Sequence, residues 1–136
     1  MDKKKTVLDV TVVKLVCQLN IMVCDYIDKA MPNKFRSTLV QQLVNGLCTA
    51  RKYTIKAMDL APRFQEQKYY YMDEALTEVH NVEALLNDLN DLQGISNTAK
   101  ERFDEKLADI YGNLSRLLNS FEGKLREADA QSHDNA

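Results

Sequence analysis

The sequence is poor in the residues that interrupt regular structure, with only 4 glycines and 2 prolines among its 136 residues. Because the hydrophobic fraction of 45% is normal for a globular protein, this scarcity argues against a disordered chain and against a turn-rich all-β fold. The length corresponds to one domain and is too short for a (β/α)₈ barrel or a complete dinucleotide-binding fold. No run approaches the ~18–20 apolar residues that a membrane span needs. We therefore expect a single domain that does not bind a membrane.

Residues that carry catalytic or metal chemistry are also scarce. A di-metal site in a helical bundle needs paired Glu-x-x-His motifs, whereas His80 has Thr77 at the required position. His80 and Glu83 are an isolated pair, which we expect at the surface or at an edge. The four glycines stand singly, so no phosphate-binding loop is present. The sequence predicts no enzyme, no cofactor, no metal site and no small-molecule substrate.

Three cysteines, Cys17, Cys24 and Cys48, are an odd number without metal-type spacing. This pattern favours the reducing cytoplasm. No histidine lies near them in the sequence to activate a thiol. We therefore expect all three to be buried as small hydrophobic side chains.

Three short breaks divide the chain into four stretches in which apolar residues recur every three or four positions. The breaks lie at residues 31–33, 61–63 and 93–97. The pattern predicts an all-α fold, an up-down-up-down antiparallel four-helix bundle, because short connections make neighbouring helices antiparallel. The predicted domain spans residues 1–127, with helices at about 7–30, 37–60, 65–92 and 98–126 and a disordered tail at 128–136.

Local signals support three of the predicted helix boundaries. Thr38 with Gln41, and Thr98 with Glu101, fit the reciprocal capping box that begins a helix. Gly94 occupies the position of the left-handed residue that commonly follows a helix.

Charge is distributed unevenly along the chain, although the net charge is only −2. Residues 32–68 contain seven basic and two acidic residues, a net charge of +5, and residues 69–91 contain six acidic and no basic residues. Lys52 and Lys56 lie one helical turn apart, and Arg63 could extend their row. Such a row can contact phosphates. It can equally pair with the acidic third helix, in the same bundle or in a neighbouring subunit.

Three consecutive tyrosines, Tyr69, Tyr70 and Tyr71, occur near the start of the predicted third helix. They could close the end of the bundle. Alternatively, they could form a surface that binds a partner or stacks on bases, because tyrosine anchors interfaces at low entropic cost.

Two segments resemble motifs of a known family. Residues 31–43 read MPNKFRSTLVQQL, and residues 114–121 read LSRLLNSF. They are similar to motifs of the four-helix-bundle accessory proteins of diversity-generating retroelements (accessory variability determinant, Avd) and their ribosomal-intervening-sequence relatives. In the first motif the matching residues are Pro32, Arg36, Thr38, Leu39 and Leu43. In the second, Arg116 and Leu118 match, and Phe121 replaces a tryptophan.

The resemblance implies a homo-oligomer, a pentamer in that family, which binds the reverse transcriptase of the retroelement and its structured template RNA without catalysing a reaction. The chain departs from the family at residues 82–91, which are acidic where arginines are usual. A nucleic-acid surface is therefore expected on the second helix and its flanks. The candidate contact residues are Lys34, Arg36, Arg51, Lys52, Lys56, Arg63 and Arg116. The alternative is a protein-interaction bundle of the same fold with no RNA or retroelement role.

Overall fold

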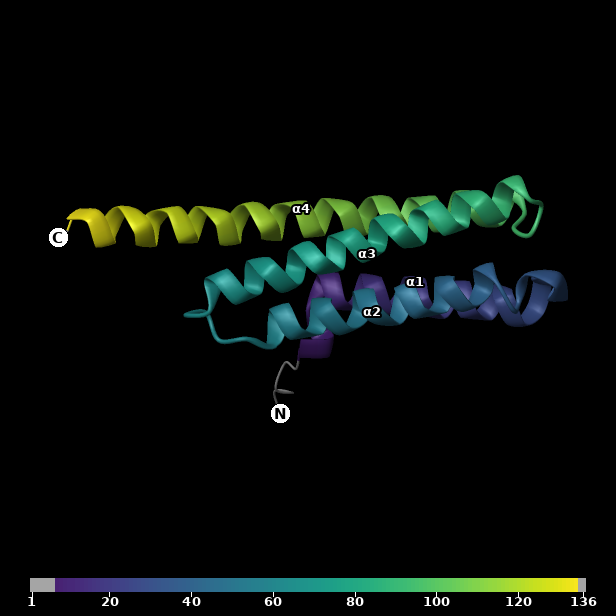
Figure 1. Cartoon of the computed structure of the whole chain (residues 1–136), viewed down its shortest axis with the longest axis horizontal. Coiled ribbons are helices and arrows are strands. Elements are labelled where there is room, and N and C mark those ends of the chain that lie inside the picture. Colours follow the sequence, from purple (N-terminus) through teal and green to yellow (C-terminus); the bar gives the residue numbers. More distant parts are fainter. Residues whose placement is uncertain (1–6, 135–136) are drawn as a thin grey trace, which may run out of the picture.

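A computed structural model describes residues 7–134, which form four α-helices and two short 3₁₀ turns (Figure 1). The helices are α1 (Thr11–Ala30), α2 (Leu39–Asp59), α3 (Gln65–Asp91) and α4 (Asn97–Asp134), and the 3₁₀ turns are η1 (Val7–Asp9) and η2 (Asn33–Phe35). Consecutive helices run in opposite directions, and α1 contacts α2 and α4 while α3 contacts α2 and α4. The predicted all-α four-helix bundle is confirmed.

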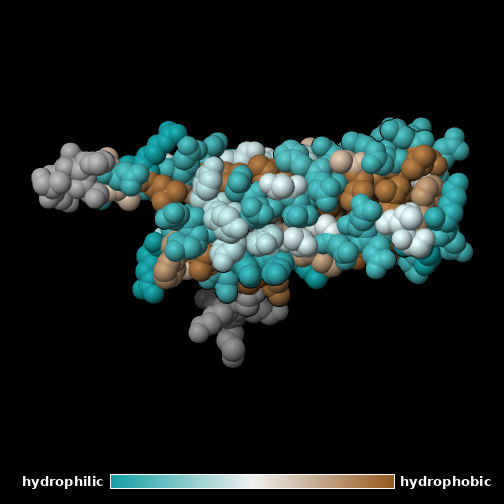
Figure 2. All heavy atoms as spheres, in the orientation of Figure 1, coloured by the Kyte–Doolittle hydropathy of each residue, from teal (hydrophilic) through white to brown (hydrophobic). Residues whose placement is uncertain are grey.

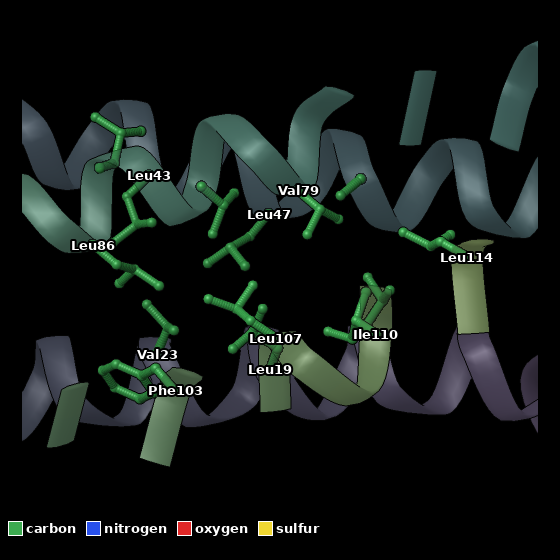
Figure 3. Close-up of a cluster of buried hydrophobic side chains, with 14 of the residues drawn as sticks. Leu19, Val23, Leu43, Leu47, Val79, Leu86, Phe103, Leu107, Ile110 and Leu114 are labelled. Atoms are coloured by element: carbon green, nitrogen blue, oxygen red, sulfur yellow. The ribbon is translucent and has the colours of Figure 1, made fainter. Parts of the chain in front are cut away.

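Apolar side chains from all four helices meet along the bundle axis (Figure 3). Leu19 on α1, Leu43 on α2 and Leu86 on α3 are at most 2% exposed, and Phe103, Leu107 and Ile110 on α4 are at most 1% exposed. This burial explains why the spacing of three and four residues predicts the helices, because that spacing places one apolar stripe on each helix. No helix within residues 7–134 has an apolar stretch long enough to cross a membrane.

The helix bounds differ from the predicted ones mainly at the two ends of the chain. The predicted first helix began at residue 7, but Val7–Asp9 form η1 and α1 begins at Thr11. The predicted disordered tail at 128–136 is wrong as far as Asp134, because α4 continues to that residue. Residues 122–134 are rich in good helix formers, and Arg126 pairs with Glu122 one turn away at 2.6 Å. Residues 1–6 and 135–136 of the predicted domain and tail lie outside the described part.

The predicted capping boxes are wrong in their side-chain bonds. Thr38 stands before α2 as expected, but its hydroxyl donates to the Phe35 carbonyl at 3.4 Å and does not cap the helix. At the start of α4 the cap is Ser96, whose Oγ accepts a hydrogen bond from the Ala99 backbone N–H at 3.2 Å. Thr98 therefore lies inside the first turn. The Thr38 backbone N–H also donates to the Phe35 carbonyl at 3.3 Å, so Thr38 is held by a turn that directly follows η2, and the capping-box pattern does not reveal this turn.

The predicted left-handed glycine is also one residue out of place. Gln93 takes the left-handed conformation with φ of 64°, and Gly94 does not have a positive φ. Glycine is needed at position 94 because there is no room for a side chain: a Cβ there would lie 2.9 Å from Cε2 of Phe35. The α1–α2 and α3–α4 connections thus pack together at one end of the bundle (Figure 1). The most continuous apolar area on the face shown in Figure 2 lies toward that end.

Candidate interaction surface

The seven basic candidate residues are all exposed, but they lie in separate parts of the bundle. Lys34 and Arg36 belong to the α1–α2 connection, and Arg63 to the α2–α3 connection at the opposite end (Figure 1). Arg116 lies on α4. Only the α2 residues Lys52 and Lys56 lie next to a second feature noted in the sequence, the tyrosine cluster. The structure therefore supports one composite surface and not a single site of seven residues.

Stacked tyrosines connect α2 to α3 beside the two lysines. The rings of Tyr53 on α2 and Tyr71 on α3 lie 6.0 Å apart with an interplanar angle of 22°. Lys52 Nζ is 5.8 Å from the centre of the Tyr53 ring, and Lys56 Nζ is 5.4 Å from the centre of the Tyr71 ring. Both separations are within the range of cation–π attraction. We call Lys52, Tyr53, Lys56, Tyr70 and Tyr71 the lysine–tyrosine patch.

Close packing of α2 on α3 places the patch across the two helices. Gly46 of α2 faces Val82 of α3, and a Cβ at Gly46 would lie 3.1 Å from Cγ2 of Val82. Tyr70 completes the patch, since its ring meets that of Tyr71 at 5.4 Å and 65°. Tyr70 is 56% exposed, so the third ring presents much of its surface to solvent.

The charges of α2 and α3 are not paired with each other within residues 7–134. The ion pairs in this region are Lys29–Asp25, Lys100–Asp104 and Arg126–Glu122, and each joins residues four apart on one helix. The basic residues of α2 therefore have no ion pair with the acidic residues of α3 in the described chain. Of the two forms of pairing considered from the sequence, the one within the bundle is not found.

Tyr71 lies between two shallow hollows on this surface. One, of about 300 Å³, is formed by Glu66, Gln67, Tyr70 and Tyr71. The other, of about 270 Å³, is formed by Lys56, Asp59, Leu60 and Tyr71. Each hollow therefore combines aromatic surface with one carboxylate, a feature that the sum of charges along the sequence did not reveal.

The remaining candidates make local contacts that explain their positions. Arg36 donates through Nη2 to the Ile27 carbonyl at 3.5 Å, which ties the connection to the end of α1. Lys34 lies 5.1 Å from the Phe35 ring centre, and Arg63 lies 4.7 Å from that of Phe64. Arg36 thus has a structural role in holding this connection.

Arg116 lies beside a separate groove between α1 and α4. Its Nη2 donates to Asn113 Oδ1 at 3.0 Å. Both side chains line a groove of about 460 Å³ together with Val10, Thr11 and Leu117. Arg116 is therefore remote from the lysine–tyrosine patch in sequence and in its contacts.

The cysteines are not buried as predicted. Cys24 and Cys48 are exposed, and Cys17 is half-buried. Cys24 Sγ donates to Asn20 Oδ1 at 3.3 Å. Partial burial raises the pKa of the Cys24 thiol, the neighbouring Cys48 adds to the increase, and Arg51 opposes it. Arg51 therefore lies on the α1 side of α2. The sequence prediction failed because these thiols sit just outside the buried stripes of their helices.

A further polar contact joins His80 on α3 to Tyr111 on α4. The His80 ring stacks on Tyr111 at 4.8 Å, and Tyr111 Oη lies 3.2 Å from His80 Nδ1. His80 is exposed, as predicted. Burial and the Glu83 carboxylate raise the pKa of Tyr111. Within residues 7–134, no group of three or more His, Cys, Asp or Glu side chains is arranged to hold a metal ion.

Lys68 is a buried lysine, and no pattern in the sequence distinguishes it from its exposed neighbours. It is 6% exposed, and its Nζ donates to the Ala57 carbonyl at 2.9 Å. The ammonium also lies 5.8 Å from the centre of the Phe121 ring. Lys68 thus closes the last turn of α2, where a positive charge is favoured by the helix dipole.

No protein-family model, curated protein or solved structure matches the chain.

Proposed function

We propose that this protein is a non-catalytic accessory subunit of a diversity-generating retroelement that binds the reverse transcriptase and its template RNA. The family assignment depends on the motif similarity at residues 31–43 and 114–121. The observation that carries the binding role is the lysine–tyrosine patch, whose two lysines lie over tyrosine rings and have no ion pair in the described chain.

The chemistry of the patch suits an RNA with unpaired bases. Lysine ammonium groups attract phosphates, and each phosphate that is neutralised makes binding more dependent on salt. Exposed tyrosine rings provide flat surfaces on which bases stack with little sequence preference. Lys52 and Lys56 would therefore contact the backbone, and the Tyr53 and Tyr71 rings beneath them would contact bases.

The test is a titration of labelled structured RNA with the full chain at several salt concentrations. Lys52→Glu/Lys56→Glu should weaken binding at low salt and lower the slope of log K against log salt by roughly 1–2. Lys14→Glu/Arg102→Glu is the matched control, since it changes the net charge equally at two exposed positions on α1 and α4. Wild-type binding that does not depend on salt would contradict the proposal. So would equal losses in the two double variants.

The alternative function is a protein-interaction bundle with no RNA role. The specific observation in its favour is that Asp59 and Glu66 line the hollows beside the patch, where they would repel phosphates. Co-purification with a reverse transcriptase encoded beside the gene would support the accessory role. Light scattering tests the self-association expected of such a subunit, and a monomer at micromolar concentration would contradict a homo-oligomer.

A further inference from the structure

The hollow formed by Glu66, Gln67, Tyr70 and Tyr71 has four walls from the first turns of α3. Glu66 and Tyr70 are four residues apart, and so are Gln67 and Tyr71. Residues at this spacing are neighbours on one helix face. The Glu66 carboxylate and the Gln67 amide therefore lie one helical turn before the Tyr70 and Tyr71 rings, and the hollow lies among these four side chains.

The aromatic walls are held in place by contacts within the chain. Tyr71 stacks on Tyr53 and carries the Lys56 ammonium at 5.4 Å from its ring centre. Tyr70 rests against Tyr71 at an angle of 65°. Because Tyr70 remains 56% exposed, its ring is ordered on one side and available to a ligand on the other.

Glu66 is the charged side chain among the four that line the hollow, whereas Lys56, whose ammonium lies over the Tyr71 ring, lines the neighbouring hollow. Glu66 is exposed and forms no ion pair within the described chain. Residues 69–91, which continue the same helix, contain no lysine or arginine. The nearest basic residue on α3, Lys68, is buried and donates to the Ala57 carbonyl, so it does not occupy the hollow. A phosphate entering here would meet the Glu66 carboxylate.

We propose that this hollow binds an arginine side chain of a protein partner. A guanidinium is planar, so it can stack on the Tyr70 ring while its N–H groups donate to the Glu66 carboxylate and the Gln67 amide oxygen. A lysine ammonium lacks the plane and the forked donors. This site does not depend on the RNA role of Lys52 and Lys56, and of its four residues it shares Tyr71 with the hollow that Lys56 lines.

Nuclear magnetic resonance of the full chain can test the assignment with three peptides, Ac-Gly-X-Gly-amide in which X is arginine, lysine or citrulline. The arginine peptide should shift the Tyr70 ring and Gln67 side-chain amide signals with a dissociation constant on the order of millimolar. Citrulline keeps the shape of arginine without its charge, and it should bind at least about fivefold more weakly, as should lysine, since each loses charge-assisted or stacked contacts.

Variants separate the hollow from the acidic surface around it. Glu66→Gln should weaken arginine binding about fivefold or more, because it removes the charged acceptor. Asp88→Asn is the matched control, since it removes one exposed carboxylate of the same helix at a distant position and should leave binding unchanged. Tyr70 is exposed, so Tyr70→Phe should fold normally and keep binding, whereas Tyr70→Ala should abolish the stacking. Far-ultraviolet circular dichroism verifies the fold of each variant.

Three results would overturn the assignment. Equal shifts with arginine and citrulline would show that charge is not recognised. Equal weakening by Glu66→Gln and Asp88→Asn would show attraction to the whole acidic helix. A uridine oligonucleotide that shifts Tyr70 at lower concentration than the arginine peptide would assign the hollow to RNA.

Discussion

The α3–α4 connection offers a sharp test of the structure, because two adjacent residues there should respond to substitution in opposite ways. Gln93 has a left-handed φ of 64°. Replacing it with glycine relieves ~1–2 kcal/mol of left-handed strain. The greater conformational freedom of glycine in the unfolded chain offsets ~0.5–1 kcal/mol of this gain. Gln93→Gly should therefore stabilise the protein by about 0.5–1 kcal/mol, a rise in Tm of roughly 1–4 °C for a chain of this size.

Gly94→Ala should have the opposite effect. A Cβ at position 94 would lie 2.9 Å from Cε2 of Phe35 and 3.2 Å from Cδ2 of Leu89. Overpacking of this kind costs ~1–3 kcal/mol, while the reduced freedom of the unfolded chain returns about 0.4–1 kcal/mol. We expect a net loss of roughly 0.5–2 kcal/mol in the free energy of unfolding.

Urea denaturation followed by far-ultraviolet circular dichroism measures both variants against the wild type. A third variant, Phe35→Leu, makes room beside position 94, so combining it with Gly94→Ala should cost less than the sum of the two single changes. The reasoning is refuted if Gly94→Ala stabilises the protein while Gln93→Gly destabilises it. Destabilisation by both Gln93→Gly and Gly94→Ala would instead place the left-handed residue at Gly94, as the sequence alone predicts, because alanine is strained where φ is positive.

Three other predictions follow from single contacts. Ser96→Ala should destabilise the protein by about 1 kcal/mol through loss of the α4 cap, whereas Thr98→Ala should change stability by no more than about 0.5 kcal/mol in the same urea assay. Burial and the charge of Lys124 lower the pKa of Lys68 below its usual 10.5, so the unfolded chain binds more protons between the two values. The stability of the wild type relative to Lys68→Met should therefore rise with pH across that window in thermal melts. Maleimide labelling followed by mass spectrometry should modify Cys24 and Cys48 in the native protein before Cys17, and Cys48→Ser should speed labelling of Cys24 by removing one cause of its raised pKa.

The sequence predicts the bundle well because its fold depends on a repeated local pattern. Leu43 and Leu47, like Leu107 and Ile110, recur at spacings of four and three and are at most 1% exposed. The positions of caps and turns are harder to predict, because they depend on contacts between distant segments. The contact of Phe35 with Gly94 is one example, since it joins two connections that are far apart in the chain.

The candidate surface shows a similar division between local and distant information. Lys52 and Lys56 could be placed on one face of a helix from their spacing alone. Their association with Tyr71 depends on the register of α2 against α3, and a single sequence does not reveal that register. The exposure of Cys24 and Cys48 has the same origin, because a small rotation of a helix decides whether a residue beside the apolar stripe is covered.

The opposite charges of α2 and α3 raise the question of what neutralises them. If the charges of α2 and α3 paired with each other, little unpaired charge would be left on the surface for a partner to bind. Within residues 7–134, however, no ion pair joins the two helices. The lysines instead lie over tyrosine rings, and such contacts leave an ammonium its full charge. The Glu66 carboxylate is likewise exposed one turn from Tyr70. One end of the bundle therefore presents a cationic and an anionic surface separated by Tyr71. An anionic ligand and a cationic side chain can be bound there side by side. Lys52→Glu/Lys56→Glu should then weaken binding of the anionic ligand, and Glu66→Gln should weaken binding of the cationic side chain.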